Sequence, residues 1–591
     1  MRKGLYTGYV NPKAPRISAP PRPVVLGNPY TIKDFSGGWD AVTNELNMAR
    51  RFSRVMENVS LAQDGSVAVR YGCSLFADLA DVGMSEIVGM EYFATYICAV
   101  DTTGKVALVE GDGTISVVWD ATIAAQRSVP AWSPTEYVSF SQLRNQLVIC
   151  NGVDKALSVQ SNKTCNYLVD LGTLQNTRVP IAKYVFAHQR YLIMGGDPNF
   201  PDRLYIGSRD TVGTFFGDPP PNDAVNIDLA SYISGDSTIT GINAFREFLV
   251  VTFPNACLVA QLGVYSGSQH TPRFDDPLQE IGGVAHKSMA FLGDDLLLLD
   301  VAGVQSLSRV FVTNKLQPIS MSDNVQPELV KSINRVPIFS NAETSPFGIY
   351  HHSQNSYYLF VPNNADIEGV TETRAFVLQY ISEKKIEAWA DFRDWKWRSV
   401  CKSLLHDMFT SAGTKIFLHG RDENPIYGDY VGDEETWSDN TAFTDHHGLT
   451  PATETDTKGI PISFAWELPW MDFGVRMAEK SVKYLQIDSD GTGQFIVHGF
   501  VDNLYEARDI GEPWNDDTLF SDGLGWLRAD KLLQPNISIQ LVGGNADGYG
   551  LSPYGSGPYG GGRMSSEERL YEFPQTGKLH KLRIEGSVNE K

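Results

Sequence analysis

The chain has 591 residues, of which 42% are hydrophobic and 20% are charged, so a wholly disordered chain is excluded. At this length one hydrophobic core stops growing, and we expect several subdomains or one large repetitive architecture. The formal net charge of −21 argues against a protein that grips nucleic acid through its phosphates.

The composition also favours a mostly β protein. The 53 glycines, 31 prolines and many aromatic residues interrupt short apolar runs, which is typical of many strands joined by turns. No run has the length of a membrane-spanning helix, and Arg2 and Lys3 are not followed by the apolar segment of a signal peptide. The six cysteines form no CxxC pair, so we expect small buried hydrophobic residues rather than a zinc or redox site.

Residues 1–34 are predicted to form an extended N-terminal arm packed along a neighbour or the ring, with a disordered tail as the alternative. Its first 30 residues contain six prolines, which oppose both helices and central strands. Residues 35–85 are predicted to form an opening element that begins with Phe35-Ser36-Gly37-Gly38. We expect a possible helix over 44–52, and then a β-hairpin of 57–61 with 66–71 whose turn is Asp64-Gly65.

Two motifs in this opening element carry a family resemblance. Glu57-Asn58-Val59, followed by Asp64-Gly65 and then Arg70-Tyr71-Gly72, resembles the start of the tail nozzle (tail tubular protein B-like) family of short-tailed bacteriophages, the podoviruses. Looser similarities of the same kind extend to Gly586. The resemblance implies a β-propeller that assembles as a six-fold ring at the tip of the tail.

Residues 86–441 are predicted to form the propeller blades. Four evenly spaced strands suggest the first blade, and the later blades follow with glycine or asparagine turns between strands. We expect strands at 87–92, 96–101, 105–110 and 114–119; 136–140, 146–150 and 156–159; 184–196 and 202–208; 239–262; 281–308; and 348–352, 356–361, 374–380, 387–391, 395–400, 415–419 and 425–430. A short helix is expected within 318–330.

Several residues in this region invite a chemical interpretation. His188 and Arg190, predicted to alternate on one strand, are interpreted as a structural pair between blades rather than as catalytic groups. Trp389, Trp395 and Trp397 suit a core better than a sugar-stacking platform. The pairs Asp294-Asp295, His351-His352 and His446-His447 are consecutive, and consecutive strand residues diverge, so we expect neither an acid/base dyad nor a zinc site.

Residues 442–591 are predicted to form an antiparallel β-sandwich or platform domain. Strands are expected at 461–470, 480–488, 494–500 and 527–532, with a closing strand at 579–586. Asp488 and Asp490 lie in a D-x-D-G-x-G loop and are the metal-ligand candidates, although a plain turn is favoured because no downstream glutamate completes a calcium loop. The glycine- and tyrosine-rich stretch 543–562 is predicted to be a loop.

No nucleophile elbow, phosphate-binding loop, metal cluster or dinucleotide fingerprint is evident, so we predict no enzyme and no cofactor. The resemblance implies a virion protein of the tail tip, made in the host bacterial cytoplasm, whose homo-hexamer attaches to the head-tail adaptor and portal proteins. It would retain the genome and conduct DNA during ejection without binding it specifically, with tail fibres as a further candidate partner. A carbohydrate-binding or carbohydrate-cleaving β-propeller tail protein is the alternative, and a cell-surface adhesin is a third.

Overall fold

The computed structural model describes most of the chain from residue 30 onward. The described residues are 30–62, 65–169, 179–216, 223–263, 265–266, 269–293, 295–307, 320–334, 345–363, 372–381, 386–421, 462–473, 480–486, 493–501, 537–543, 570–577 and 579–588. The first 33 residues form a unit of their own. All but four residues of that unit, and with them most of the predicted arm 1–34, therefore lie outside the described part.

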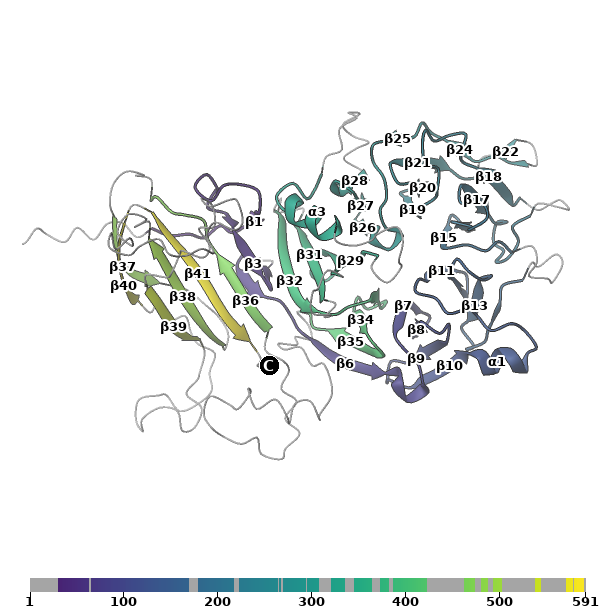
Figure 1. The fold of residues 1–591 in the computed structure, drawn as a ribbon, viewed down its shortest axis with the longest axis horizontal. Helices are drawn as coiled ribbons and strands as arrows, with labels where there is room; N and C mark the ends of the chain where they lie inside the picture. The colour runs from purple at the N-terminus through teal and green to yellow at the C-terminus, as the bar shows by residue number, and fades with distance from the viewer. Residues whose placement is uncertain are drawn as a thin grey trace, which may run out of the picture. The chain divides into compact units, whose positions relative to one another are not determined.

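The structure is mostly β, and its strands between residues 73 and 419 form a succession of propeller blades (Figure 1). Three four-stranded antiparallel sheets come first. They are β7 (Ile87–Phe93), β8 (Tyr96–Asp101), β9 (Val106–Val109) and β10 (Ile115–Trp119); β11 (Ser139–Leu143), β12 (Gln146–Cys150), β13 (Leu157–Gln160) and β14 (Cys165–Tyr167); and β15 (Tyr184–His188), β16 (Tyr191–Gly195), β17 (Arg203–Ile206) and β18 (Val225–Asp228).

Three further blade sheets bring the number of separate blades in the described residues to six. They are β19 (Gly241–Phe245), β20 (Phe248–Thr252), β21 (Ala256–Gln261), β24 (Arg273–Phe274) and β25 (Leu278–Gln279); β26 (Ala290–Leu292), β27 (Asp295–Asp300) and β28 (Gly303–Ser306); and β33 (Ser399–Lys402), β34 (Met408–Ala412), β35 (Lys415–His419) and β6 (Cys73–Asp78). The predicted mostly β propeller is confirmed.

A four-stranded antiparallel unit completes the ring between the last two of these sheets. Its strands are β29 (Phe347–His351), β30 (Ser356–Asn363), β31 (Glu372–Ile381) and β32 (Ile386–Trp395). The first strands of most neighbouring blades contact one another, β19 contacts β27 and η3 (His286–Ser288) of the fifth blade, and β33 contacts β7, which closes the ring. Strand β6 pairs with β35, so an N-terminal strand completes the last blade and ties the two ends of the ring together.

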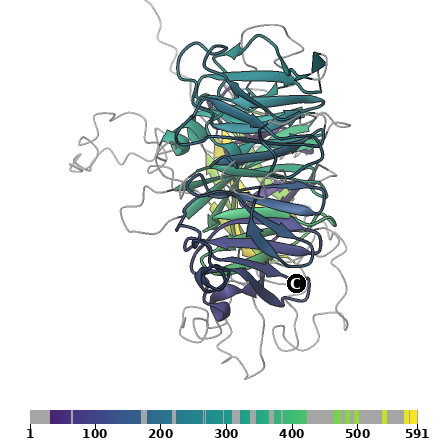
Figure 2. The ribbon, with the colours of Figure 1, turned by 90° about the vertical axis from the view of Figure 1, so that its right-hand side faces the viewer.

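The blades bury both faces of their strands. Figure 2 shows the blades from the side, with strands of successive blades one above another. Leu296, Leu297, Leu298 and Leu299 in β27 are all fully buried. Leu296 and Leu298 pack in one hydrophobic cluster, while Leu297 and Leu299 pack in another. Because successive strand residues point to opposite faces, both faces need apolar side chains, and the alternation of polar and apolar residues is lost.

The C-terminal strands extend the β29–β32 unit into a nine-stranded sheet. Its order is β29-β30-β31-β32-β3-β36-β41-β38-β39, with β3 (Val55–Glu57), β36 (Ile462–Glu467), β41 (His580–Val588), β38 (Gly493–Val501) and β39 (Ile537–Gly543). Strand β3 pairs in parallel with β32 through Glu57 and Asp391, and antiparallel with β36. A three-residue strand of the opening element therefore links the propeller to the C-terminal strands.

The remaining elements are short. They are β1 (Gly38–Trp39) with β2 (Phe52–Ser53), β4 (Val59–Leu61) with β5 (Val67–Val69), β22 (Tyr265–Ser266) with β23 (Gln269–His270), β37 (Lys480–Gln486) with β40 (Leu570–Gly577), and the helices η1 (Leu79–Val82), α1 (Ala121–Gln126), η3 (His286–Ser288) and α3 (Gln326–Asn334). The predicted hairpin is confirmed by the pairing of β4 with β5. The helix expected within 318–330 is confirmed as α3, with Pro327 in its first turn.

Two predictions about secondary structure were wrong. Residues 44–52 form turns rather than a helix. The Asp40 carboxylate accepts the backbone N–H groups of Val42 and Thr43 at 2.9 and 2.8 Å, and the Asn44 side chain accepts that of Leu46 at 3.0 Å. Such local bonds compete with the helical ones. The strand expected at 480–488 is present as β37, but its place in the sheet was wrong, because it pairs with β40 and does not join the main C-terminal sheet.

Candidate functional site

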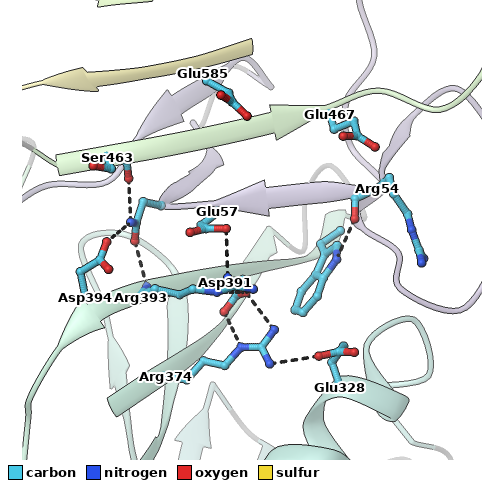
Figure 3. A network of polar contacts seen from close by, with 12 residues as sticks. Arg54, Glu57, Glu328, Arg374, Asp391, Arg393, Asp394, Ser463, Glu467 and Glu585 are labelled. Atoms are coloured by element: carbon cyan, nitrogen blue, oxygen red, sulfur yellow. Dashed lines mark hydrogen bonds and ion pairs between the residues drawn. The ribbon is translucent and has the colours of Figure 1, made fainter. Parts of the chain in front are cut away.

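Asn58, which directly follows β3, is the centre of a buried polar network. Figure 3 shows other members of this network, among them Asp391, Arg393 and Asp394. Its side chain is fully buried, and its φ of 54° lies in the left-handed region that asparagine tolerates better than most residues. The Nδ2 group donates to Asp394 Oδ2 at 3.1 Å and to the Ser463 carbonyl at 2.7 Å. The Oδ1 atom accepts from Arg70 Nε at 3.0 Å and from the Arg393 backbone N–H at 2.9 Å. Both donors and both lone pairs of the amide are thus used.

The backbone of Asn58 adds two more links. Its N–H donates to the Asp391 carbonyl at 2.8 Å, and its carbonyl accepts from the Arg70 N–H at 3.0 Å. The Arg70 guanidinium is buried and lies 4.4 Å from the centre of the Trp395 ring. A single residue therefore connects the opening hairpin, the end of β32 and strand β36.

Asp391 in β32 lies between two arginines. The Arg374 guanidinium donates to both carboxylate oxygens at 2.8 Å, and Arg393 donates through Nε to Oδ2 at 2.8 Å. The Asp391 side chain is only 4% exposed, so these bonds compensate a charge that has lost its water. Arg374 also reaches Glu328 of α3 at 3.2 Å, and Arg393 reaches Glu57 at 3.2 Å.

The pKa values of this network follow from burial and from these pairs. Burial raises the pKa of Glu57, partly offset by the charge of Arg393. Burial would also raise the pKa of Glu328, but the hydrogen bond and charge of Arg374 outweigh it and lower the value. Burial would lower the pKa of Arg374, but the hydrogen bonds and charges of Asp391 and Glu328 together outweigh it and raise the value. This is the behaviour of structural ion pairs. We call Asn58, Arg374, Asp391, Arg393 and their partners the junction network.

The closing strand β41 is tied to the same region. Lys581, whose side chain is 6% exposed, forms ion pairs with Glu467 of β36 and with Glu45, the latter at 2.8 Å. The Trp466 indole donates to Ser53 Oγ at 2.8 Å. Gly38 lies so close to β32 that a Cβ there would be 2.7 Å from the Cβ of Ala388, so no side chain fits. Charged pairs and close backbone contact together hold this junction.

His188 and Arg190 do not alternate on one strand, so that prediction was wrong. His188 ends β15, whereas Gln189 and Arg190 form the turn to β16 with φ values of 47° and 73°. His188 Nε2 lies 3.0 Å from the Glu247 carbonyl of the next blade. Arg190 instead forms an ion pair with Asp210. The turn separates two side chains that a continuous strand would have placed on one face.

The tryptophan prediction is confirmed for the core. Trp389, Trp395 and Trp397 are 2–3% exposed, so they offer no surface on which a sugar could stack. His351 is buried, while the exposed His352 stacks on His406 with ring centres 4.9 Å apart. The six cysteines are buried and unbridged, as expected.

The metal-ligand candidates Asp488 and Asp490 lie outside the described residues, as do Asp294, His446-His447, the strands expected at 425–430 and 527–532, and all of 543–562 except Gly543. Where the structure does describe the chain, no group of three or more His, Cys, Asp or Glu side chains could hold a metal ion. No helix among the described residues is long and apolar enough to cross a membrane.

Sequence reasoning did not single out the ionic part of the junction network. A sequence pattern that could have indicated this network is the run Asp391-Phe392-Arg393-Asp394-Trp395, in which charged residues follow apolar ones. A buried charge of this kind requires a partner, but the partners come from Arg374 in β31, Glu328 in α3 and Glu57 in β3. Only the fold brings those residues together.

Comparisons with known proteins find no family and only weak similarity to solved structures. No family model matches the chain, and no curated protein matches it. Solved structures that resemble it include PorZ of the type-IX secretion system of Porphyromonas gingivalis (12% identity, TM-score 0.32), over 57% of this chain and 37% of that one. Others are YCF48 bound to D1 peptide (10% identity, TM-score 0.35, 64% of this chain and 99% of that one) and BamB from Moraxella catarrhalis (9% identity, TM-score 0.32, 61% and 95%). None of these descriptions concerns a phage tail, and the assignment of the propeller rests on the strand order given above.

Proposed function

We propose that this chain is a structural virion protein: a hexameric tail nozzle that forms the distal part of a short phage tail, attaches to the adaptor and portal complex, retains the genome and conducts DNA during ejection. One observation carries the proposal. The residues that resemble the nozzle family, Glu57-Asn58 and Arg70, are those that join the propeller to the C-terminal strands.

An architectural role explains why those residues are buried. Asn58 and Arg70 are 0% and 4% exposed, and every hydrogen-bonding position of the Asn58 amide is used within the chain. Groups in this state hold elements together, and they have no capacity left for a substrate. A DNA conduit must withstand force while its parts keep their places, which suits such a junction.

The charge of the chain supports passage of DNA rather than its capture. Each copy carries a formal charge of −21, so a six-copy ring would carry six times that charge. A strongly acidic wall repels phosphates and lets the genome slide.

Immunogold electron microscopy tests the proposal. Virions would be purified from the lysate of the host that makes this chain and labelled with an antibody against the recombinant protein. We expect gold confined to the distal tip of a short tail, and antibody pre-absorbed with the recombinant chain should remove it. Label on lateral spikes would favour the carbohydrate-active alternative, and particles without any label would refute both assignments.

A further inference from the structure

A second set of charged residues lies at the centre of the ring, at the entrances of the innermost strands. Lys183 directly precedes β15, and Tyr137 precedes β11 by two residues. His286 and Lys287 form the short helix η3 that leads into β26, and Arg398 directly precedes β33. Because each of these strands begins its own blade, the five residues gather at one end of the ring.

Tyr137 lies at the middle of this group. The Lys183 ammonium is 5.0 Å from the centre of the Tyr137 ring, and the Lys287 ammonium is 4.7 Å from it. Lys287 also donates to the Val88 carbonyl of β7 at 3.2 Å, a contact between the fifth blade and the first. We call Tyr137, Lys183, His286 and Lys287 the axial cluster.

The axial cluster lacks a counter-charge within the part of the chain that the structure describes. Arg398 is paired with Glu86 at 2.6 Å, but no carboxylate pairs there with either lysine. Tyr137 is 5% exposed, and its buried hydroxyl has no hydrogen-bond partner among the described residues. Burial lowers the pKa of Lys287 to about 7, helped by the charges of Lys183 and Arg398, and burial lowers the pKa of Lys183 as well. A buried hydroxyl without a partner, beside two half-buried cations that have no carboxylate partner in the described residues, is costly.

His286 supplies a further donor. Its Nδ1 atom accepts the Ile242 backbone N–H at 3.3 Å, which places the ring proton on Nε2. Burial lowers the pKa of His286 to about 3, with Lys287 and Lys183 adding to the effect, so the ring is neutral at physiological pH. Its Nε2–H can then donate without adding a third charge to the cluster.

We propose that the axial cluster binds a small oxyanion of the phosphate or carboxylate type. The two ammonium groups and the Tyr137 hydroxyl are all donors, and an oxyanion has the acceptors and the negative charge that the cluster lacks. A neutral ligand would leave the two lysines uncompensated, and a cation would be repelled by them. The proposal does not depend on the nozzle function, so either can fail alone.

Isothermal titration calorimetry on the full chain at pH 6.5 and constant ionic strength tests it, with sodium phosphate, sodium acetate and sodium chloride as titrants. We expect one saturable phosphate or acetate site per chain and none for chloride. Whichever of the two binds identifies the oxyanion type. Lys183→Met and Lys287→Met should each weaken binding by about tenfold or more, and Tyr137→Phe by a few-fold.

Two variants make the test specific. Lys287→Arg keeps the positive charge and should retain most of the affinity, whereas a merely misfolded Lys287→Met would also lose its native circular dichroism. Lys163→Met is the matched control, because Lys163 also lies over a tyrosine ring, Tyr96 at 5.2 Å, but is paired with Glu110. It should bind as the wild type does. Absence of any saturable heat, or unchanged binding in a Lys183→Met/Lys287→Met double variant, would overturn the proposal.

Discussion

The junction network and the axial cluster differ in how their charged side chains are paired: the buried Asp391 has two arginine partners, whereas the half-buried Lys183 and Lys287 have no carboxylate partner in the described residues. At the junction, the Asp391 carboxylate is held by Arg374 and Arg393, and Asn58 has no unused hydrogen-bonding group. At the axis, Lys183 and Lys287 face an aromatic ring and a tyrosine hydroxyl that finds no partner in the described residues. A saturated network is the mark of architecture, whereas an unsaturated one has capacity left for a ligand. The comparison predicts opposite outcomes when a charge is removed.

Removing the junction carboxylate should have the largest effect. Asp391→Asn would leave Arg374 and Arg393 without their shared counter-ion in a site where the Asp391 side chain is 4% exposed. Breaking a buried pair in this way costs about 3–5 kcal/mol. Urea unfolding followed by tryptophan fluorescence would measure the loss, because Trp389 and Trp395 lie on the same strand. A loss below about 1 kcal/mol would show that the pairs are not the source of cohesion.

Asn58 allows backbone strain to be separated from side-chain bonding. Asn58→Ala removes four side-chain hydrogen bonds and places alanine at a φ of 54°, so we expect a loss of about 3 kcal/mol. Asn58→Gly removes the same bonds but tolerates the positive φ, so it should be about 1 kcal/mol less damaging. Equal losses in the two variants would mean that the left-handed conformation costs nothing here.

At the axis, removing a charge should instead stabilise the protein. The pKa of Lys287 is about 7 in the folded chain against 10.5 for an ordinary lysine. Below pH 7 the Lys287 ammonium is charged in both the folded and the unfolded protein, and the folded protein is destabilised by the full cost of burying that charge. Between pH 7 and 10.5 only the unfolded state is protonated, so stability rises with pH, and above 10.5 the cost is gone. Charged and titratable neighbours of the Lys287 ammonium include Lys183, Arg398 and His286. They are the same in the wild type and in a Lys287 variant.

Lys287→Met should therefore raise the thermal unfolding midpoint at pH 6.5, by roughly 2 °C, in a buffer free of oxyanions. The advantage over the wild type should shrink steadily toward pH 10. Lys163→Met, which removes a lysine with a carboxylate partner, should show no such advantage at any pH. A Lys287→Met variant that is less stable than the wild type at pH 6.5 would mean that the bond to Val88 outweighs the uncompensated charge.

The sequence predicted the propeller better than either charged site, for physical reasons. Short apolar runs and turn residues are local signals, and strands such as β7 to β10 follow from them directly. The importance of Glu57-Asn58 was also visible, because the family resemblance lies there. Arg374, Asp391 and Glu328 come together from β31, β32 and α3, and Lys183 and Lys287 from different blades. These contacts join residues that are far apart in the sequence, so no local sequence pattern predicts them.

Removing one partner of an exposed ion pair should change the stability of the protein least of all these substitutions. Arg190 and Asp210 form such a pair in the third blade, where the Arg190 side chain is 59% exposed. Arg144 also contacts Asp210, at 3.2 Å, so Arg190→Ala leaves the carboxylate with one cation. Burial would raise the pKa of Asp210, but the hydrogen bonds and charges of Arg190 and Arg144 outweigh it and lower the value. In Arg190→Ala, Arg144 remains to stabilise the ionised carboxylate. Water screens what is lost, and we expect the thermal unfolding midpoint to move by less than about 1 °C. A shift as large as that of Asp391→Asn would mean that ion pairing itself, rather than burial, distinguishes the junction.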